Sequence, residues 1–556
     1  MSKKKVVVLG GGVAGLSSAH ELLERGFDVE VYELNPKIPG GKARSMPFRG
    51  SGKHGRYDLP GEHGFRFFPR FYEHVTHTME RIPYKDNEEG VFGNLVQADR
   101  AKMARYGMES ITMITRFPRS LKDLRTLFEE LFDSNSGLEK DDIEFFTQRL
   151  WVLITSCQER RLAEYEIISW WDFIEAEGRS KAYQNLLAIG LTRTLVAAKA
   201  KEASARTGGD ILLQLIFDMV TPGVSSDRLL NGPTNDVWIY PWMSYLNDLG
   251  MDYHYESKIS SINCANGEIT SATIIQKDEN GKEVTIEATG DYYICAMPVE
   301  VTAPLMNKDI LAADPSLKGV VELAPNVSWM NGIQFYLKKD VKVTHGHVIY
   351  IDSEWALTSI SQAQFWGEYN LNNYGDGSVN GVLSVDISDW FNKGDLIEKE
   401  ASDCSEQEIA DEVWHQLKKS LNVDGEVLLE DDNLHSWFLD PDIIAPNAPG
   451  LTENFNMEPL LINKKDTWKF RPDAVTKIPN FFLAADYVRT YTDLATMEGA
   501  NEAARRATNG IIDASGSDEK KCKLWKLHEP NIFWPFRKHD QSRFEKGLPW
   551  DGKIIG

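Results

Sequence analysis

Apolar and polar positions near the N-terminus predict a strand, a helix and a second strand in quick succession. Residues 4–9 form a β-branched run, as a buried parallel strand does. From Leu16 to Arg25 apolar residues recur at helical spacing, and Gly26 ends the predicted helix. Residues 27–32 form the second strand. This order is typical of an α/β protein with a doubly wound parallel sheet.

The middle of the chain follows two other patterns. Residues 73–234 repeat Leu, Phe and Trp at spacings of three and four, as in 121–132 and 212–216, which predicts a mainly helical region. Residues 301–474 mix helical segments with short apolar runs, which predicts a mixed α/β domain. The runs that predict its strands lie at 333–337, 348–351 and 382–385.

The first predicted turn reads GGGVAG and matches the GxGxxG pattern of dinucleotide sites. Gly10 permits the tight turn, Gly12 lets the backbone approach a pyrophosphate, and Gly15 lets the helix pack closely on the strand. Ala14 lies in the first turn of the helix, whose N–H groups point toward the phosphates. Glu33, at the end of the second strand, is placed to accept hydrogen bonds from an adenosine ribose.

A second glycine pair follows the second strand and is joined to basic residues. Gly41 can wrap the far side of a pyrophosphate, and Lys42 and Arg44 can offset its charge. This extension is characteristic of FAD sites and absent from NAD dehydrogenases. The alternative is a solvated Gly–Lys loop.

A third segment near the C-terminus completes the predicted cofactor site. Residues 481–485 form a strand that ends at Asp486, whose carboxylate we expect to accept hydrogen bonds from the ribityl chain or the adjoining phosphate. A helix then begins near Thr496 and Met497, and its N–H groups would stabilise negative charge at the flavin pyrimidine edge. Ala500 opens a face of this helix that carries only methyl groups. An alanine-rich packing helix without a ligand is the alternative.

With these motifs, the chain resembles the FAD-dependent oxidoreductases of the phytoene desaturase and flavin amine oxidase superfamily, above all plant-type phytoene desaturases. ADY at 485–487 and TMEGA at 496–500 match the group's flavin-closing segment. EHGFRFF at 62–68 is similar to its Glu-Thr-Gly-Leu-His-Ile-Phe-Phe stretch near the flavin, with Arg66 where that motif has His.

The resemblance implies a cofactor, a fold and a domain order. Its FAD sites include the neighbourhood of Gly64 and Phe65 and an adenine-side segment around Ile259. The implied fold is a Rossmann-type FAD-binding domain interrupted by two insertions. The expected domains are a discontinuous FAD-binding domain (1–72, 235–300 and 475–515), a mainly helical cap (73–234), a mixed α/β substrate domain (301–474) and a basic aromatic tail (516–556).

Candidates for the substrate pocket are few. Arg66, Phe67 and Phe68 follow the predicted flavin loop directly, and an apolar substrate lying on the flavin needs such walls. Trp366 belongs to a stretch that alternates aromatic and polar residues and is a further candidate. Ordinary core packing is the alternative for both groups, and no catalytic side chain is singled out.

Metal-binding and disulfide patterns are weak. His345 and His347 have a metal-like spacing, but no third ligand of matching motif lies nearby in the sequence, so we expect no metal site. The five cysteines form no CxxC pair, and an odd number argues against a disulfide framework.

Charge bears on partners and location. Asp and Glu outnumber Lys and Arg by 83 to 61, so the net charge of −22 makes a nucleic-acid partner unlikely on electrostatic grounds. Between residues 521 and 546, however, seven basic residues face three acidic ones among several aromatics. We expect this tail either to pack across a domain or subunit seam or to contact an anionic membrane surface. The expected location is cytoplasmic, with possible peripheral attachment to a membrane.

Together these features predict an FAD-dependent oxidoreductase. By resemblance, it desaturates a hydrophobic polyene or isoprenoid by hydride transfer to flavin N5, with a quinone or oxygen as the electron acceptor. The alternatives are a flavin-dependent amine oxidase, a non-redox activity like that of carotene isomerases, an activity like hydroxysqualene dehydroxylation, and a flavoprotein whose FAD is only structural.

Overall fold

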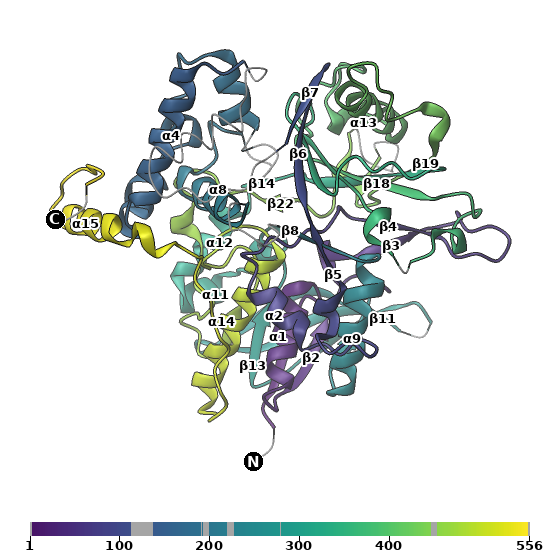
Figure 1. Cartoon of the computed structure of the whole chain (residues 1–556). Helices are drawn as coiled ribbons and strands as arrows, with labels where there is room; N and C mark the ends of the chain where they lie inside the picture. Colours follow the sequence, from purple (N-terminus) through teal and green to yellow (C-terminus); the bar gives the residue numbers. More distant parts are fainter. Residues whose placement is uncertain are drawn as a thin grey trace.

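The fold was analysed in a computed structural model of the chain. It describes residues 3–112, 137–190, 192, 199–219, 227–278, 280–367, 369–445 and 453–553. Figure 1 shows a cofactor part at the bottom, a helical unit at the upper left and a large sheet at the upper right.

The cofactor part is built around a five-stranded parallel sheet drawn from three distant segments of the chain. Its strand order is β23-β13-β1-β2-β9. The β-branched residues 6–8 in its centre are fully buried, because a parallel sheet is covered on both faces. Its strands are β1 (Lys5–Leu9), β2 (Asp28–Tyr32), β9 (Asp252–His254), β13 (Tyr292–Cys295) and β23 (Phe481–Leu483).

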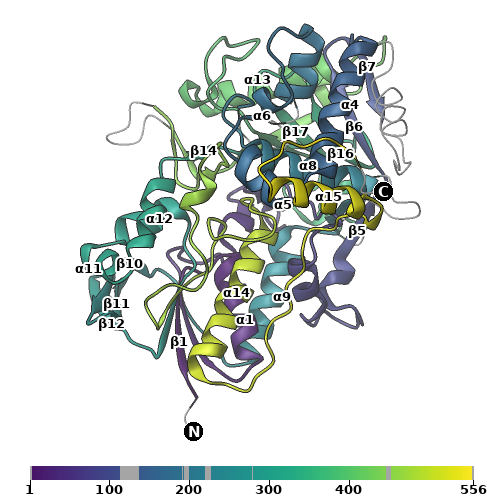
Figure 2. The ribbon, with the colours of Figure 1, turned by 90° about the vertical axis from the view of Figure 1, so that its left-hand side faces the viewer.

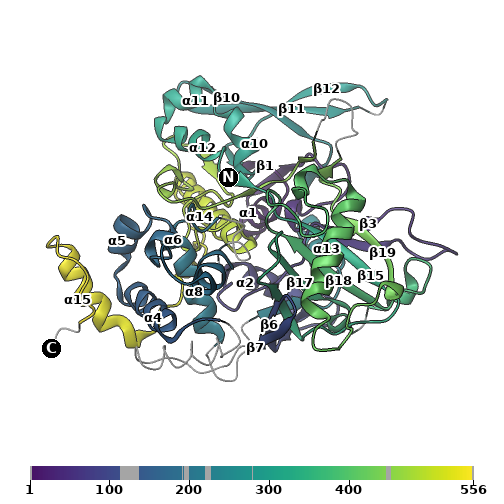
Figure 3. The same ribbon diagram turned by 90° about the horizontal axis from the view of Figure 1, so that it is seen from above.

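Helices cover one face of this sheet and a small second sheet covers the other. In Figure 2, α1 (Val13–Leu23), α9 (Tyr240–Asp248) and α14 (Met497–Ser515) lie side by side. Ala503, Ala504 and Ala507 of α14 are fully buried, so the predicted methyl face is a packing face. Figure 3 shows a three-stranded antiparallel sheet on the other side, formed by β10 (Lys258–Ala265), β11 (Glu268–Lys277) and β12 (Glu283–Ala288).

The large sheet, here called the substrate sheet, has seven strands in the order β19-β15-β18-β17-β16-β6-β7. All neighbours are antiparallel except β16 and β6. The helix α13 (Glu406–Leu421) packs on this sheet through one shared apolar core. The strands are β6 (Arg100–Arg105), β7 (Met108–Thr112), β15 (Asn331–Leu337), β16 (Gly346–Tyr350), β17 (Leu357–Ser361), β18 (Gly381–Ile387) and β19 (Leu434–Leu439).

The runs at 333–337, 348–351 and 382–385 are therefore strands, as predicted, apart from the last residue of the second run. Part of the expected helical cap differs. β6 and β7 extend the substrate sheet, while β5 (Leu95–Ala98) and β8 (Asp227–Leu230) pair with each other. These strands are short and carry several charged residues, which is usual near sheet edges and hides the alternation that marks a strand.

Most of the described residues between 137 and 219 form the helical unit, whereas Val75, Met79 and Ile82 pack in the core of the cofactor part. The apolar core of the helical unit is centred on Phe146, Trp170 and Tyr183. Residues 212–216 lie in α8, which confirms that predicted helix, whereas 121–132 lie outside the described residues. The main helices are α4 (Lys140–Thr155), α5 (Gln158–Arg160), α6 (Trp170–Phe173) and α8 (Ala205–Met219), with π-helical turns at Arg161–Tyr165 and Tyr183–Gly190.

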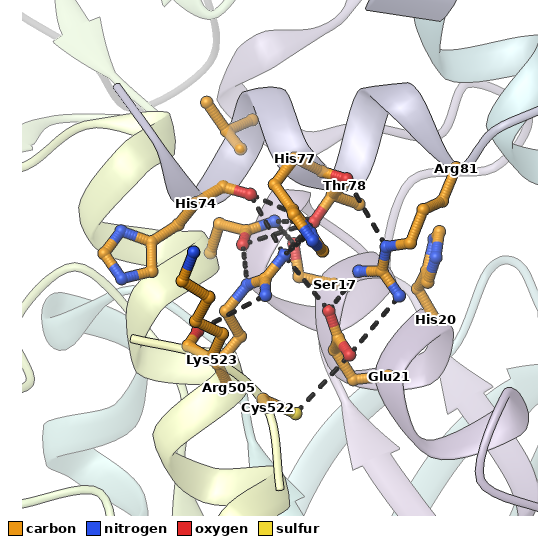
Figure 4. A network of polar contacts seen from close by, with 12 residues as sticks. Ser17, His20, Glu21, His74, His77, Thr78, Arg81, Arg505, Cys522 and Lys523 are labelled. Atoms are coloured by element: carbon orange, nitrogen blue, oxygen red, sulfur yellow. Dashed lines mark hydrogen bonds and ion pairs between the residues drawn. The ribbon is translucent and has the colours of Figure 1, made fainter. Parts of the chain in front are cut away.

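The C-terminal tail begins against the cofactor part. Figure 4 shows Glu21 of α1 and Arg505 of α14 paired at 3.2 Å beneath it. The Sγ of Cys522 donates to Glu21 at 3.4 Å, and the carbonyl of Lys523 accepts from Arg505 at 3.4 Å. Burial alone would raise the pKa of Glu21, but Arg505 and Arg81 outweigh it and hold the pKa at about 2.

The tail then crosses to the helical unit and ends in α15 (Trp534–Phe544). Phe533 is buried against Trp151, with the ring centroids 5.9 Å apart. Asp540 is buried and pairs with Arg160 of α5 at 2.9 Å. The tail thus packs across the seam between the cofactor part and the helical unit, one of its two expected positions. Within the described ranges, the helices are too short or too polar to traverse a bilayer.

Candidate active site

The glycine turn has the geometry that its motif predicts. Gly10 has a φ of +106°, a conformation that residues with a Cβ rarely adopt. A Cβ on Gly15 would lie 1.9 Å from the carbonyl oxygen of Gly10, so only glycine lets α1 approach the turn this closely. No side chain caps α1 at Gly12, and its first turn, which includes Ala14, carries no acidic residue. The N–H groups there are available to a phosphate.

Glu33 lies beside this turn at the end of β2. Its carboxylate accepts hydrogen bonds from the backbone N–H of Gly11 at 2.7 Å and of Asn35 at 2.8 Å. Burial raises the pKa of Glu33. The N–H of Ser257 donates to the main-chain oxygen of Glu33 at 2.8 Å, which brings the segment of Ile259 to the same edge of the sheet. Carboxylate lone pairs remain for a ribose, and that role stays a prediction.

The second glycine loop lies next to the first, since Gly12 and Gly40 form a parallel bridge. A Cβ on Gly41 would meet the Cα of Gly12 at 3.0 Å, so a side chain at Gly41 would crowd the Gly12 backbone. Bare backbone from two loops therefore faces one narrow space. Such a space suits a pyrophosphate, which binds through main-chain N–H groups.

The two basic residues of this loop also have partners within the protein. The Arg44 guanidinium pairs with Asp442, with Glu458 at 3.2 Å and with the carbonyl of Gly41 at 2.9 Å. Lys42 donates to the carbonyl of Pro459 and lies 3.5 Å from Glu300. A buried cation needs a nearby carboxylate, and these partners supply one. The role of Lys42 and Arg44 at the pyrophosphate stays a prediction.

The flavin-edge helix begins where the sequence predicts. Thr496 caps α14 by accepting a hydrogen bond from the N–H of Gly499 at 3.1 Å. Asp486, Met497 and Ala500 are only half buried, as expected for positions that face a bound group. Glu498 points the other way. Its carboxylate accepts the N–H of His74 at 2.9 Å and so holds the first turn of α2 (His74–Glu80).

A narrow cavity with a free volume of about 10 Å³ opens beside the cofactor loops. Polar and apolar residues both line it. The polar residues in its wall are Glu62, Arg66, Thr234 and Gln362, and the other residues are Leu229, Leu230, Gly232, Ile360 and Phe365. The apolar wall suits a hydrophobic molecule, while the polar groups are few enough to act on defined atoms.

Glu62 and Arg66 are the charged residues of this wall. Thr234 donates its N–H to Glu62 at 3.0 Å, and its hydroxyl lies 3.0 Å from the other carboxylate oxygen. Burial raises the pKa of Glu62 to about 7, although the guanidinium of Arg66 opposes this. Arg66 donates to the carbonyls of Gly64 at 2.7 Å and Phe65 at 3.0 Å, and also to that of Lys42. It therefore ties the cavity wall to the second glycine loop.

The remaining pocket candidates divide into two groups. Phe67 is half buried and bridges to Leu229, which lines the cavity. Phe68 is fully buried against Trp238, at a centroid distance of 5.5 Å, and Trp366 is buried without lining the cavity. Phe68 and Trp366 are therefore core residues. Both exceptions arise because aromatic clusters pack cores more often than they line sites.

Behind the flavin loop lies a buried cluster of charges. His63 contacts Asp440 at 2.8 Å and Asp442 at 3.2 Å, close enough for the three side chains to share a metal ion. Arg44 already pairs with Asp442, and Asn331 donates to Asp440 at 2.7 Å. Burial alone would lower the pKa of His63, but Asp440 raises it to about 9. The cluster is therefore satisfied as an ion-pair network.

Sequence reasoning missed most of the cavity wall. Glu62 lay within a quoted motif but was not singled out. Thr234 and Gln362 belong to no motif, and the only signal was the polar–aromatic alternation that includes Gln362 and Phe365.

The model of one protein family matches residues 13–512, over nine-tenths of the chain, and it is described as flavin-containing amine oxidoreductase. The chain belongs to this family. The two bare glycine loops and the open helix start fit the dinucleotide, so the protein is an FAD-dependent oxidoreductase.

Individual relatives and structures agree with this assignment. The chain is 44% identical over 159 residues to 4,4'-diaponeurosporene oxygenase of Staphylococcus haemolyticus, which covers 27% of this chain and 25% of that protein. It is 36% identical over 88 residues to zeta-carotene desaturase of Zea mays, covering 15% of this chain and 14% of that protein. The aligned stretches thus span a quarter or less of these relatives.

The fold extends much further than these alignments. Cyclohexylamine oxidase from Brevibacterium oxydans superposes with a TM-score of 0.59 at 12% identity, covering 92% of this chain and 100% of that one. This likeness confirms the predicted Rossmann-type α/β fold.

Proposed function

We propose that this protein is a desaturase of an apolar, polyene-like isoprenoid. The observation that carries the proposal is the cavity beside the cofactor loops, which joins the apolar side chains of Leu229, Leu230, Ile360 and Phe365 to one buried carboxyl group, Glu62. The relatives that match short stretches of this chain are named for carotenoid reactions, which agrees with a hydrophobic substrate.

Desaturation removes a hydride from one carbon and a proton from its neighbour. FAD, when bound, accepts the hydride. Glu62 is the residue in the cavity wall that can accept the proton, since burial raises its pKa to about 7, close to neutral pH. Thr234 holds the carboxylate in place through two hydrogen bonds, and Arg66 stabilises its charged form. With FAD bound, a quinone or oxygen would serve as the final electron acceptor.

An amine oxidase is the rival function, because the family and the structural neighbours carry that name. The guanidinium of Arg66 lies in the cavity wall and disfavours an ammonium ion there. Hydrophobic contact with Leu229, Leu230 and Ile360 favours a hydrocarbon chain instead.

An apolar substrate would be drawn from a membrane, and the tail offers one surface for contact. Trp534 is 57% exposed at the start of α15, and Lys538 lies over its ring at 4.8 Å. We propose that this pair rests at the headgroup level of an anionic bilayer. Trp534→Ala should lower sedimentation with anionic vesicles, and equal sedimentation of both proteins would refute this contact.

Anaerobic mixing of the purified holoenzyme with candidate substrates tests the proposed reaction. We expect a polyene in detergent micelles to bleach the visible flavin absorbance and to yield a product that lacks two hydrogens. Alkylamines should leave the absorbance unchanged. Bleaching by amines with aldehyde as product, or a polyene product of unchanged mass or with a lost hydroxyl, would contradict desaturation.

A further inference from the structure

Two side chains of the substrate sheet carry buried polar atoms that the protein does not satisfy. Gln362 lines the cavity, and its Oε1 is buried without a hydrogen-bond partner. The Nε2 of His347 is also buried and has no partner. Each residue is 9% exposed. Buried polar atoms without partners are rare because they are destabilising, so two of them close together indicate a ligand that completes them.

Strand pairing places both side chains on one face of the substrate sheet, where Ile360 and Gln362 form part of the cavity wall. His347 lies directly opposite Ile360 in the antiparallel pair of β16 and β17, so their side chains share a face of the sheet. Gln362 follows Ile360 by two residues, and its N–H donates to the carbonyl of Val382 at 2.8 Å, which continues the ladder. Side chains two residues apart on a strand point the same way. Ile360 itself lines the cavity.

The surroundings of His347 are aromatic. Its ring lies 5.2 Å from that of Phe65 and 5.3 Å from that of Phe67, between centroids. Burial lowers the pKa of His347 to about 4, so the imidazole is neutral at physiological pH and offers one N–H and one lone pair. Its neighbour His345 differs, because it is partly exposed and pairs with Asp99 at 3.1 Å.

We propose that this wall receives a hydroxyl group carried by an otherwise apolar substrate. A hydroxyl can donate to the Oε1 of Gln362 and at the same time accept from the imidazole of His347 in the tautomer that carries its hydrogen on Nε2. A pure hydrocarbon would leave both atoms unsatisfied, and a carboxylate would offer no hydrogen to the amide oxygen. The inference rests on the proposed function, since it specifies the substrate class of the same cavity.

Binding to the oxidised holoenzyme tests the inference without turnover. The probes are a linear polyene hydrocarbon and its terminally hydroxylated counterpart of equal length, and quenching of tryptophan fluorescence reports binding. We expect the hydroxylated polyene to bind about tenfold more tightly. Gln362→Met and His347→Phe should each reduce this preference toward unity by weakening binding of the hydroxylated probe alone. Both variants should also melt at a higher temperature without ligand, because an unsatisfied polar atom has been removed.

Gln364→Met is the matched control. Its amide nitrogen already donates to the carbonyls of Thr344 at 2.8 Å and Ser361 at 3.0 Å, so this change should lower the melting temperature and leave the preference intact. Equal binding of the two probes, or variants that keep the preference, would overturn the inference.

The proposed function can fail separately. Bleaching by polyenes without a hydroxyl preference would support desaturation and overturn only the hydroxyl site. A hydroxyl preference without bleaching by any polyene would support the hydroxyl site and overturn desaturation. If neither probe bound, both proposals would fall.

Discussion

The cofactor part and the cavity offer different chemical groups to a ligand. Around the glycine loops, the surface offered to a ligand is main chain, and a Cβ on Gly41 would crowd the Cα of Gly12 at 3.0 Å. In the cavity, side chains face the ligand instead of main chain. Among them are Glu62, Thr234 and Gln362, which come from three separate segments. A main-chain site depends on local spacing and tolerates little change. A side-chain site can be altered one contact at a time.

The largest expected effect comes from a change in the glycine turn of the cofactor part. Gly15→Ala would place a Cβ 1.9 Å from the oxygen of Gly10, so α1 must move away from the turn. We expect purified protein that carries no flavin, measured as visible absorbance relative to protein. Gly208→Ala is the control, because a Cβ there meets nothing within 4 Å, and it should load flavin fully. A yellow Gly15→Ala protein would show that the turn does not bind the dinucleotide.

The second largest expected effect comes from a change in the cavity. Glu62→Gln removes the proton acceptor but keeps its shape, so flavin should load normally while the rate of its reduction by substrate falls by about 10²–10⁴. In the unchanged enzyme this rate should rise with pH up to about 7, because Glu62 acts only when deprotonated. The variant should lose that pH dependence. A variant that keeps both the rate and the pH profile would remove Glu62 from the reaction.

A smaller effect concerns the tail that packs across the seam between the cofactor part and the helical unit. Asp540→Ala removes one of the two carboxylates that pair with the buried guanidinium of Arg160, the other being Glu164, which costs about 1–3 kcal/mol. We expect the tail to be cleaved faster in limited proteolysis, and we expect the melting temperature of the protein to fall. Asp551→Ala removes half-exposed pairs with His539 and Arg543 and should cost under about 1 kcal/mol. Equal protease resistance of the two variants would mean that Asp540 does not anchor the tail.

The smallest effect is expected at His63, behind the flavin loop. Its folded-state pKa is raised from 6.5 to about 9, so its stabilising contribution is fully present below 6.5 and is lost as the pH rises through about 9. The melting temperature of the unchanged protein should therefore exceed that of His63→Gln most at acidic pH. The gap should narrow across that window. A gap that stays constant with pH would show that the ion pair with Asp440 does not contribute.

The same contrast explains what the sequence could predict. The roles of Gly10 and Gly15 depend on a spacing of a few residues, which is visible in the chain itself. The acidic partners of Arg44 could not be predicted, because they lie 398 and 414 residues away. The bond from Thr234 to Glu62 likewise spans 172 residues. Which distant side chains meet is decided by how the sheets pair, and no local pattern records it.

The strand order of the cofactor sheet has a consequence for synthesis on the ribosome. β1 and β2 emerge first, but β23 and α14 lie between residues 481 and 515. At roughly 5–20 residues per second, β1 waits on the order of 15–60 s for its second neighbour β13, and β13 waits on the order of a further 10–40 s for β23. During these intervals an unpaired apolar strand edge is exposed to aggregation. Because α14 forms part of its predicted site, FAD can bind only after translation is almost complete.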